Sequence, residues 1–133
     1  MFRYFTLSEA NAALPAVAKK FQTAITCKEA VTKIERRLQE CAMNGASVKT
    51  YMELKQELNA AVTRLYYSIE ALEGMGVSLK GLDEGLIDFP SKKFDEDVWL
   101  CWKSGETEIR FWHEINTGFM GRKPIAVSDD SLV

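Results

Sequence analysis

Apolar side chains recur at every third or fourth position through the first 73 residues of the chain, which is the spacing of one face of an α-helix. A first helical run extends from Pro15 to about Met43, and a second from about Val48 to Glu73. The apolar positions keep a heptad phase in both runs: Val17, Ala24, Cys27, Val31, Ile34, Leu38 and Cys41 in the first, and Tyr51, Leu54, Leu58, Ala61, Leu65 and Leu72 in the second. We therefore predict a long antiparallel, coiled-coil-like helical hairpin over residues 15–73.

A shorter helical segment precedes this hairpin. Thr6 and Glu9 have the spacing of a capping box, so a helix is expected to begin at Leu7. Pro15 would clash inside that helix, because it has no N–H and its ring meets the preceding turn. Residues 7–14 are therefore expected to form a separate short N-terminal helix, or else the chain kinks at Pro15.

The period changes after Gly76, where short apolar runs bounded by glycine and proline indicate strands. The stretch "VWLCWKSGETEIRFWH" reads as a β-hairpin if Ser104-Gly105 is a two-residue turn, which pairs Val98 with Phe111. This register separates an apolar face from a second face, and His113 then falls on the apolar, core-facing side. The core-facing set is Val98, Leu100, Trp102, Thr107, Ile109 and Phe111.

These patterns together predict one α+β domain spanning residues 1–133. The hairpin and the short N-terminal helix are expected to pack with a small antiparallel sheet of about three to four strands. Residues 76–124 hold the sheet and a glycine-rich loop, and residues 125–133 are expected to be a flexible tail.

Composition narrows the classes of protein that fit. The chain is 47% apolar and has a formal net charge of −2, so it is globular and has no global electrostatic preference for nucleic acid. We see neither a membrane span nor a signal peptide. Three cysteines without CxxC spacing predict neither a disulfide framework nor a zinc ribbon, so reduced thiols in the cytoplasm are expected.

The only histidine, His113, is the first candidate for a ligand-binding or catalytic group. A buried histidine hydrogen-bonded to a carboxylate or carbonyl is the simpler interpretation. The alternative is a general base or a metal ligand, with Glu114 joining it only if the strand ends there. The further candidate ligands around it are Asp88, Glu9 and Asn11. No metal site and no cofactor is predicted, and His113 with Glu114 is kept as the weak alternative.

Two surfaces are further candidates for binding. Arg122 follows the glycines of "GFMGRK", and this loop could bind phosphate or carboxylate, or Arg122 could simply pair with Glu114 or Asp88. Trp99, Arg110 and Trp112 are expected to share the outer face of the hairpin, where they form a partner-binding patch if nothing covers them. We expect Cys101 to lie beside Glu108, which would raise the pKa of its thiol and make it a poor nucleophile.

Five segments taken in order resemble one family, the bacterial domain of unknown function 2203. They are "YFTLSEANAALP" (Tyr4–Pro15), "LIDFP" (Leu86–Pro90), "LCW" (Leu100–Trp102), "FWHE" (Phe111–Glu114) and "GFMGRKP" (Gly118–Pro124). The resemblance spans nearly the whole chain and implies a bacterial cytoplasmic protein. The family has no assigned biochemical function, so the resemblance carries over no catalytic role.

Two functions therefore stand against each other. The first is a non-enzymatic scaffold that self-associates, as a homodimer, through the helical hairpin and binds a protein partner with its sheet. The second is a site for an anionic metabolite or a metal, conceivably enzymatic, built around His113, Glu114 and Arg122.

Overall fold

The computed structural model of the chain describes residues 3–126, so the expectation of a flexible tail falls mostly on residues 127–133, outside the described part. Helix α1 (Leu7–Met43) begins where the sequence predicts. The Thr6 side chain accepts the Glu9 N–H at 3.0 Å, and the Glu9 carboxylate accepts the Thr6 N–H at 2.9 Å. This reciprocal cap satisfies two of the N–H groups that a helix start leaves without a partner.

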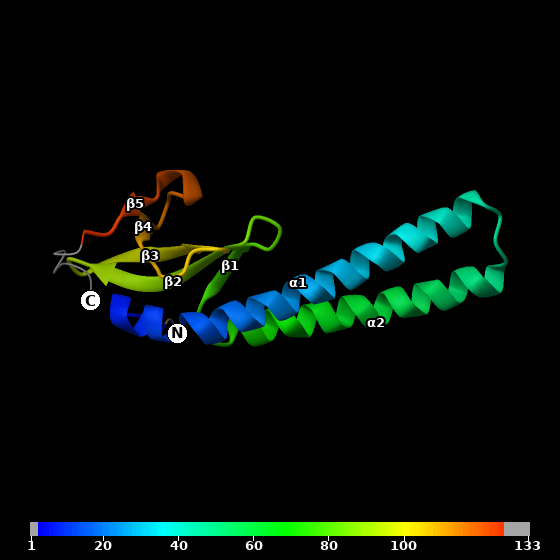
Figure 1. Ribbon diagram of the computed structural model, residues 1–133, viewed down its shortest axis with the longest axis horizontal. Coiled ribbons are helices and arrows are strands. Elements are labelled where there is room, and N and C mark those ends of the chain that lie inside the picture. Colours follow the sequence, from blue (N-terminus) through cyan, green and yellow to red (C-terminus); the bar gives the residue numbers. More distant parts are fainter. Residues whose placement is uncertain (1–2, 127–133) are drawn as a thin grey trace.

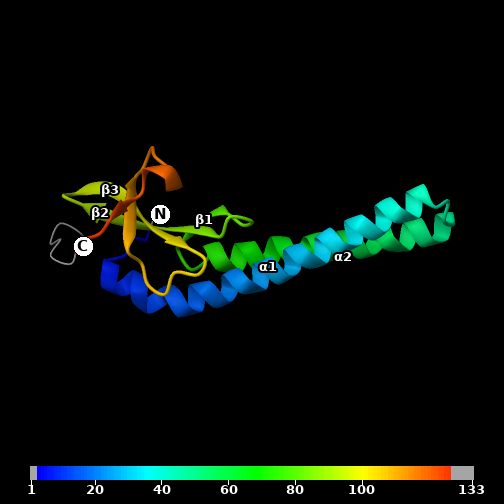
Figure 2. The ribbon, with the colours of Figure 1, turned by 45° about the horizontal axis from the view of Figure 1, so that its top comes forward.

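The expected separate N-terminal helix is not present, because α1 is continuous through Pro15. A proline inside a helix removes one backbone hydrogen bond and crowds the preceding turn, which bends a helix more readily than it ends one when both halves are packed. In Figure 2 the first turns of α1 run at an angle to the rest of the helix. Of the two sequence-based alternatives, the continuous helix bent near Pro15 is therefore the one observed.

Helix α2 (Val48–Glu73) runs antiparallel to α1 and completes the predicted hairpin. The Ser47 hydroxyl caps it by accepting the Thr50 N–H at 3.2 Å, and Gly45 turns the chain with a positive φ of 67°. Figure 1 shows both helices running on together well beyond the sheet to this turn. With ~1.5 Å of rise per residue, α1 is about 55 Å long.

Five strands form one antiparallel meander in the order β1-β2-β3-β4-β5, so the strand count is slightly above the predicted three to four. The strands are β1 (Ser78–Gly81), β2 (Leu86–Lys93), β3 (Glu96–Lys103), β4 (Phe111–Glu114) and β5 (Lys123–Pro124), with a 3₁₀ turn η1 (Phe119–Gly121) before β5. Residues 91–97, "SKKFDED", end β2 and begin β3. The turn between them consists of Phe94 and Asp95, both at positive φ, as a type I′ two-residue turn requires.

The core lies between one face of the sheet and the inner half of the hairpin. Alternate residues of the central strands are fully buried, as are the α1 residues opposite them. Phe21 meets Trp102 edge to face at 5.8 Å, and Phe5 meets Phe89 in the same way at 5.2 Å. The core comprises Phe5, Ala10, Leu14, Val17, Phe21, Leu72, Val77, Ile87, Phe89, Leu100, Trp102 and Ile109.

The register predicted for β3 and β4 is wrong by three residues. The turn at Ser104-Gly105 does form, closed by the Glu106 N–H donating to the Lys103 carbonyl at 3.0 Å. The pairing of β3 with β4 does not continue in register from this turn. Val98 lies opposite Glu114, and Trp99 lies opposite His113. An odd shift exchanges the two faces of a strand, so His113 lies on the sheet face away from the helices, not on the core-facing side.

The residues between the turn and β4 explain this shift. Ile109 is only 3% exposed and fills the core, although it lies outside both strands. Its N–H donates to the Asn11 side-chain oxygen of α1 at 2.7 Å, and the Trp102 indole N–H donates to the Glu106 carbonyl at 2.8 Å. The chain therefore leaves the sheet to reach α1 and returns only at Phe111.

Within residues 3–126, neither long helix has a stretch apolar enough to cross a membrane.

Replacing Asn11 with alanine tests the connection between α1 and the β3–β4 segment. We expect the free energy of unfolding to fall by about 1–3 kcal/mol, because the part-buried Ile109 N–H loses its acceptor. Urea unfolding of Asn11→Ala measures this. The matched control is Gln22→Ala, at an exposed position of the same helix. Equal stability of the two variants would contradict the assigned role of Asn11.

Candidate functional site

Three polar side chains meet on the sheet face that points away from the helices. Asp88 of β2 lies directly opposite Cys101 of β3, and His113 of β4 lies opposite Trp99, two residues before Cys101. Residues opposite one another on paired strands, and residues two apart on one strand, point to the same face. The alternation that sends Ile87, Phe89 and Leu100 into the core therefore turns these three outward from it.

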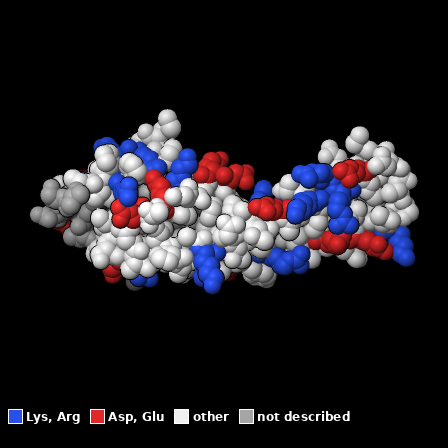
Figure 3. All heavy atoms as spheres, in the orientation of Figure 1, with Lys and Arg blue, Asp and Glu red and all other residues white. Residues whose placement is uncertain are grey.

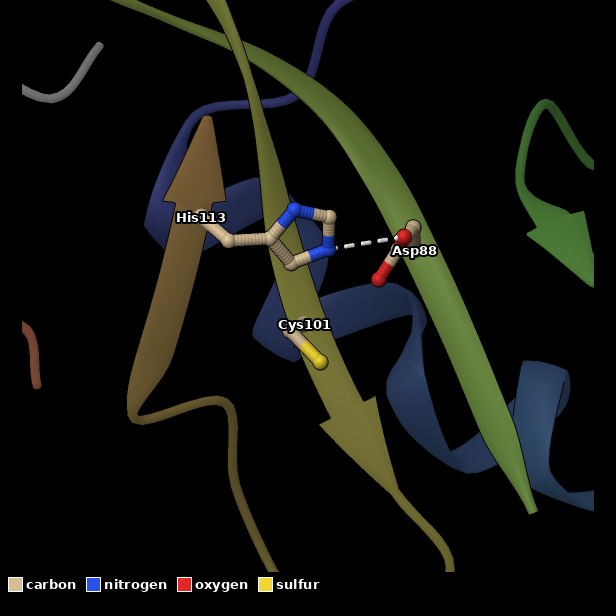
Figure 4. A group of neighbouring side chains, drawn as sticks. All are labelled: Asp88, Cys101 and His113. Carbon is tan, nitrogen blue, oxygen red and sulfur yellow. Dashed lines mark hydrogen bonds and ion pairs between the residues drawn. The ribbon is translucent and has the colours of Figure 1, made fainter. Parts of the chain in front are cut away.

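His113 is held by a hydrogen bond at each ring nitrogen. Its Nε2 lies 2.9 Å from Asp88 Oδ2 (Figure 4), and its Nδ1 lies 2.9 Å from the carbonyl oxygen of Glu114. A carbonyl oxygen can only accept, so Nδ1 must carry a proton and donate it. One further proton is then shared between Nε2 and the Asp88 carboxyl group, since two lone pairs cannot face each other at this distance. Both side chains are 3% exposed, so the pair is shielded from water.

Cys101 completes this group. One ligand-type atom from each of Asp88, Cys101 and His113 lies within 4.8 Å of those of the other two, and all three residues are buried. The pKa of the Cys101 thiol is raised to about 12, mainly by burial and secondly by the charge of the Asp88 carboxylate. Burial also raises the pKa of Asp88, although the charge and hydrogen bond of His113 oppose that shift. The expected rise in the Cys101 pKa is therefore present, but Asp88 contributes to it rather than Glu108.

A pocket of about 140 Å³ adjoins these three residues. The segment after β4 forms its outer wall, through Ile115, Thr117, Gly118 and Phe119, while Trp99 and Leu86 belong to the sheet. Lys80 of β1 is also part of the lining, and its Nζ lies 4.3 Å from the centre of the Trp99 ring. The candidate site thus combines a buried His–Asp–Cys group with one nearby cation.

Arg122 of the glycine-rich loop is fixed elsewhere. Its Nη2 donates to both carboxylate oxygens of Glu106 at 2.8 and 2.9 Å, and its guanidinium lies 3.8 Å from the Phe111 ring centre and 4.8 Å from that of Phe119. Gly121 is required beside it, because a Cβ at this position would lie 2.7 Å from the Thr117 Cβ. Arg122 therefore pairs with neither Glu114 nor Asp88, the two partners considered from the sequence.

The remaining ligand candidates do not gather around His113. The Glu114 carboxylate accepts from Lys123 Nζ at 2.9 Å, and this pair is about half exposed. Glu9 caps α1, and Asn11 binds the Ile109 N–H. Of the six candidates proposed from the sequence, the structure brings together only His113 and Asp88. Glu114 contributes through its backbone carbonyl, not through its carboxylate.

The three residues of the predicted partner-binding patch do not share one face. Trp112 lies opposite Leu100 and packs against the core, whereas Trp99 lies on the other face with His113. Arg110 precedes β4 and pairs with Glu108 at 2.8 Å, so it does not join either tryptophan in a shared patch. The corrected register accounts for both differences.

Of the three residues in this site, Cys101 is the one that is not among the ligand candidates predicted from the sequence. The predicted alternation places Trp99 and Cys101 on the face opposite Leu100, as observed, but the predicted register places His113 on the core side. With the observed register, simple alternation would have placed Asp88, Cys101 and His113 on one face.

Replacing Asp88 with asparagine is expected to change how stability depends on pH. The raised pKa means that, above the ordinary value of 3.8 and up to the folded-state pKa, the folded chain binds more protons than the unfolded chain. The contribution of Asp88 to the free energy of unfolding therefore falls as pH rises through this window, and Asp88→Asn removes that fall. Urea unfolding between about pH 4 and pH 7 measures the effect.

Asp95→Asn is the control, because Asp95 is exposed in the β2–β3 turn and asparagine tolerates its positive φ. If Asp88→Asn and wild type have parallel pH profiles, the assigned burial effect is incorrect.

The Cys101 thiol is expected to be unreactive in the folded, metal-free protein. With a pKa of about 12, roughly one thiol in ten thousand is ionised at pH 8. The double variant Cys27→Ser/Cys41→Ser leaves Cys101 as the only thiol, so its reaction with a disulfide reagent can be followed directly. We expect a rate at least 100-fold lower in buffer than in urea, and equal rates would rule out the shielded thiol.

Comparison with known proteins identifies the family. No curated protein and no solved structure matches the chain. Residues 3–125 match the sequence profile of an uncharacterised conserved protein family, DUF2203, and so include both helices, all five strands and the His113 site. Because the match spans nearly the whole chain, this protein belongs to the DUF2203 family.

Proposed function

We propose that this protein is a self-associating binding module in which the outer halves of two hairpins, one from each copy, pack together. A single observation carries the proposal: the outer half of the hairpin projects beyond the sheet with apolar side chains uncovered. We call residues 27–67 the outer hairpin, and the proposed partner is a second copy of this chain.

The sheet covers only the inner half of the hairpin. The core residues contributed by α1 end at Phe21, and α2 contributes Leu72 near its other end. In the outer hairpin the two helices pack against each other and bury Val31, Cys41, Leu54 and Ala61. A two-helix seam shields one narrow side of each helix, whereas helical bundles reach stable packing with further helices around a shared core.

Exposed apolar side chains are concentrated on α2 in this region. Val48 is 78% exposed and Tyr66 is 63% exposed, with Met52 and Val62 at 53% and 47%. Val48 and Val62 are two heptads apart, as are Met52 and Tyr66, so all four lie on one side of α2. We call these four residues the α2 stripe. An apolar stripe of this regularity is typical of a helix that packs against another helix.

The charges around the stripe fit a second copy better than a nucleic acid. Basic and acidic side chains lie beside one another over the outer hairpin (Figure 3), and Arg37 of α1 forms an ion pair with Glu57 of α2 at 3.6 Å. A phosphate backbone favours a surface of one positive sign, whereas mixed charges flanking an apolar seam favour protein partners. Lys55 and Asn59 lie between the two halves of the stripe and would favour one register of packing.

Fewer observations support the second candidate function, in which His113, Glu114 and Arg122 jointly bind an anionic metabolite. Arg122 and Glu114 each have an ion-pair partner of their own, and His113 is bound to Asp88. An anion would have to displace Glu106 to reach the Arg122 guanidinium.

A charge placed in the α2 stripe is expected to dissociate the assembly. We expect light scattering with size exclusion to give twice the mass of the chain for wild type and the monomer mass for Val62→Glu/Tyr66→Glu. The physical reason is that two glutamates per copy would lose hydration at the interface without gaining a partner. Both positions are exposed in the single chain, so the fold itself should be retained.

Met120→Glu is the matched control, because Met120 is 94% exposed but lies in η1, far along the chain from the stripe. It should keep the mass of the wild type. If wild type is monomeric at every concentration of a dilution series, or if the stripe variant keeps the dimer mass, the proposal fails.

A further inference from the structure

A carboxylate, a thiol and an imidazole lie together on the sheet face that points away from the helices. We propose that Asp88, Cys101 and His113 bind a divalent transition-metal ion of the zinc type, through a carboxylate oxygen, the Sγ and the Nε2. This site lies in the sheet, away from the outer hairpin, so it is independent of self-association.

The positions of the three donors suit one ion. Each donor atom lies within 4.8 Å of the other two. A tetrahedral zinc ion with bonds of about 2.0–2.3 Å places its ligand atoms about 3.3–3.8 Å apart. Nε2 and Oδ2, now 2.9 Å apart, need to separate only slightly to admit the ion between them. The residues come from three adjacent strands, which hold them with less freedom than a loop would (Figure 4).

The histidine is already oriented as a ligand. The Nδ1–H group donates to the Glu114 carbonyl at 2.9 Å, which directs Nε2 towards Asp88 Oδ2, with Cys101 Sγ within 4.8 Å of both. Metal-binding histidines almost always donate their second ring N–H in this way, because the outer hydrogen bond fixes both the tautomer and the ring plane. The contact to Glu114 thus has the form of an outer-sphere contact.

The donor types select the class of metal. A thiolate with an imidazole and one carboxylate favours zinc and chemically similar ions such as cobalt(II), whereas calcium and magnesium require several oxygen donors. The charge also balances, because a thiolate and a carboxylate together neutralise a divalent ion in a buried setting. When no metal is bound, a single proton lies between His113 Nε2 and Asp88 Oδ2, where the ion would bind.

The adjoining pocket supplies the fourth coordination position. Its volume of about 140 Å³ has room for several waters, each taking about 30 Å³ in the liquid. Three protein ligands and one solvent ligand is the arrangement of zinc sites that keep an open position.

Binding requires two protons to leave. The Cys101 thiol releases one when Sγ bonds to the metal, and the proton shared by Nε2 and Oδ2 is the other. Both go to solvent, and no oxidant, reductant or further reactant is needed.

Cobalt(II) titration of the full-length, chelator-treated chain tests the proposal. The expected result is saturation at one equivalent, with a thiolate-to-cobalt charge-transfer band and the strong visible bands of tetrahedral cobalt. Zinc should then abolish both sets of bands by displacing cobalt. The Cys27→Ser/Cys41→Ser variant should give the same spectrum, because Cys101 is its only thiol.

Ligand removal completes the test. Cys101→Ser should lose the charge-transfer band, and His113→Gln and Asp88→Asn should bind zinc more than about 100-fold more weakly, beyond the cost of losing an outer-sphere contact. Far-ultraviolet circular dichroism shows whether each variant folds. If one does not, the spectrum of the folded Cys27→Ser/Cys41→Ser protein still decides. The absence of its charge-transfer band, or an unchanged band in Cys101→Ser, would overturn the proposal.

Discussion

The packing of one sheet face against the inner half of α1 is the constraint on which the rest of the structure depends. Ile87, Phe89 and Leu100 are fully buried against the α1 residues Leu14, Val17 and Phe21. Side chains of a strand alternate between two faces, so the same packing fixes the residues that point the other way. Asp88, Cys101 and His113 meet because their neighbours are needed in the core.

Bringing these three polar side chains together in a buried position costs them their hydration. A carboxyl group, an imidazole and a thiol are buried together, and burial raises the pKa of both Asp88 and Cys101. The hydrogen bonds of His113 to Asp88 and to the Glu114 carbonyl offset part of the lost hydration. A buried polar group of this kind adds less to stability than apolar residues of equal size would, which favours a role for it in binding.

In the hairpin, by contrast, apolar side chains are exposed. Its inner half is held by the sheet and forms part of the core, while its outer half relies on a two-helix seam and exposes Val48, Met52, Val62 and Tyr66. Helix propensity alone stabilises such a long extension weakly, because most helical stability in proteins comes from packing an apolar face. The two ends of the molecule therefore differ: the sheet holds a buried polar group, and α2 carries an exposed apolar stripe.

The sequence by itself determined the elements that depend on local chemistry. Heptad spacing and the Thr6–Glu9 capping box specify the helical hairpin and its start, and the Ser104-Gly105 turn also forms where its residues indicate. Only the tertiary structure decided the register of β4, because Ile109 must reach the core and its N–H binds Asn11, 98 residues earlier in the chain. No local pattern contains that contact. It shifts the pairing by three residues, places His113 beside Asp88 and Cys101, and so creates the candidate site.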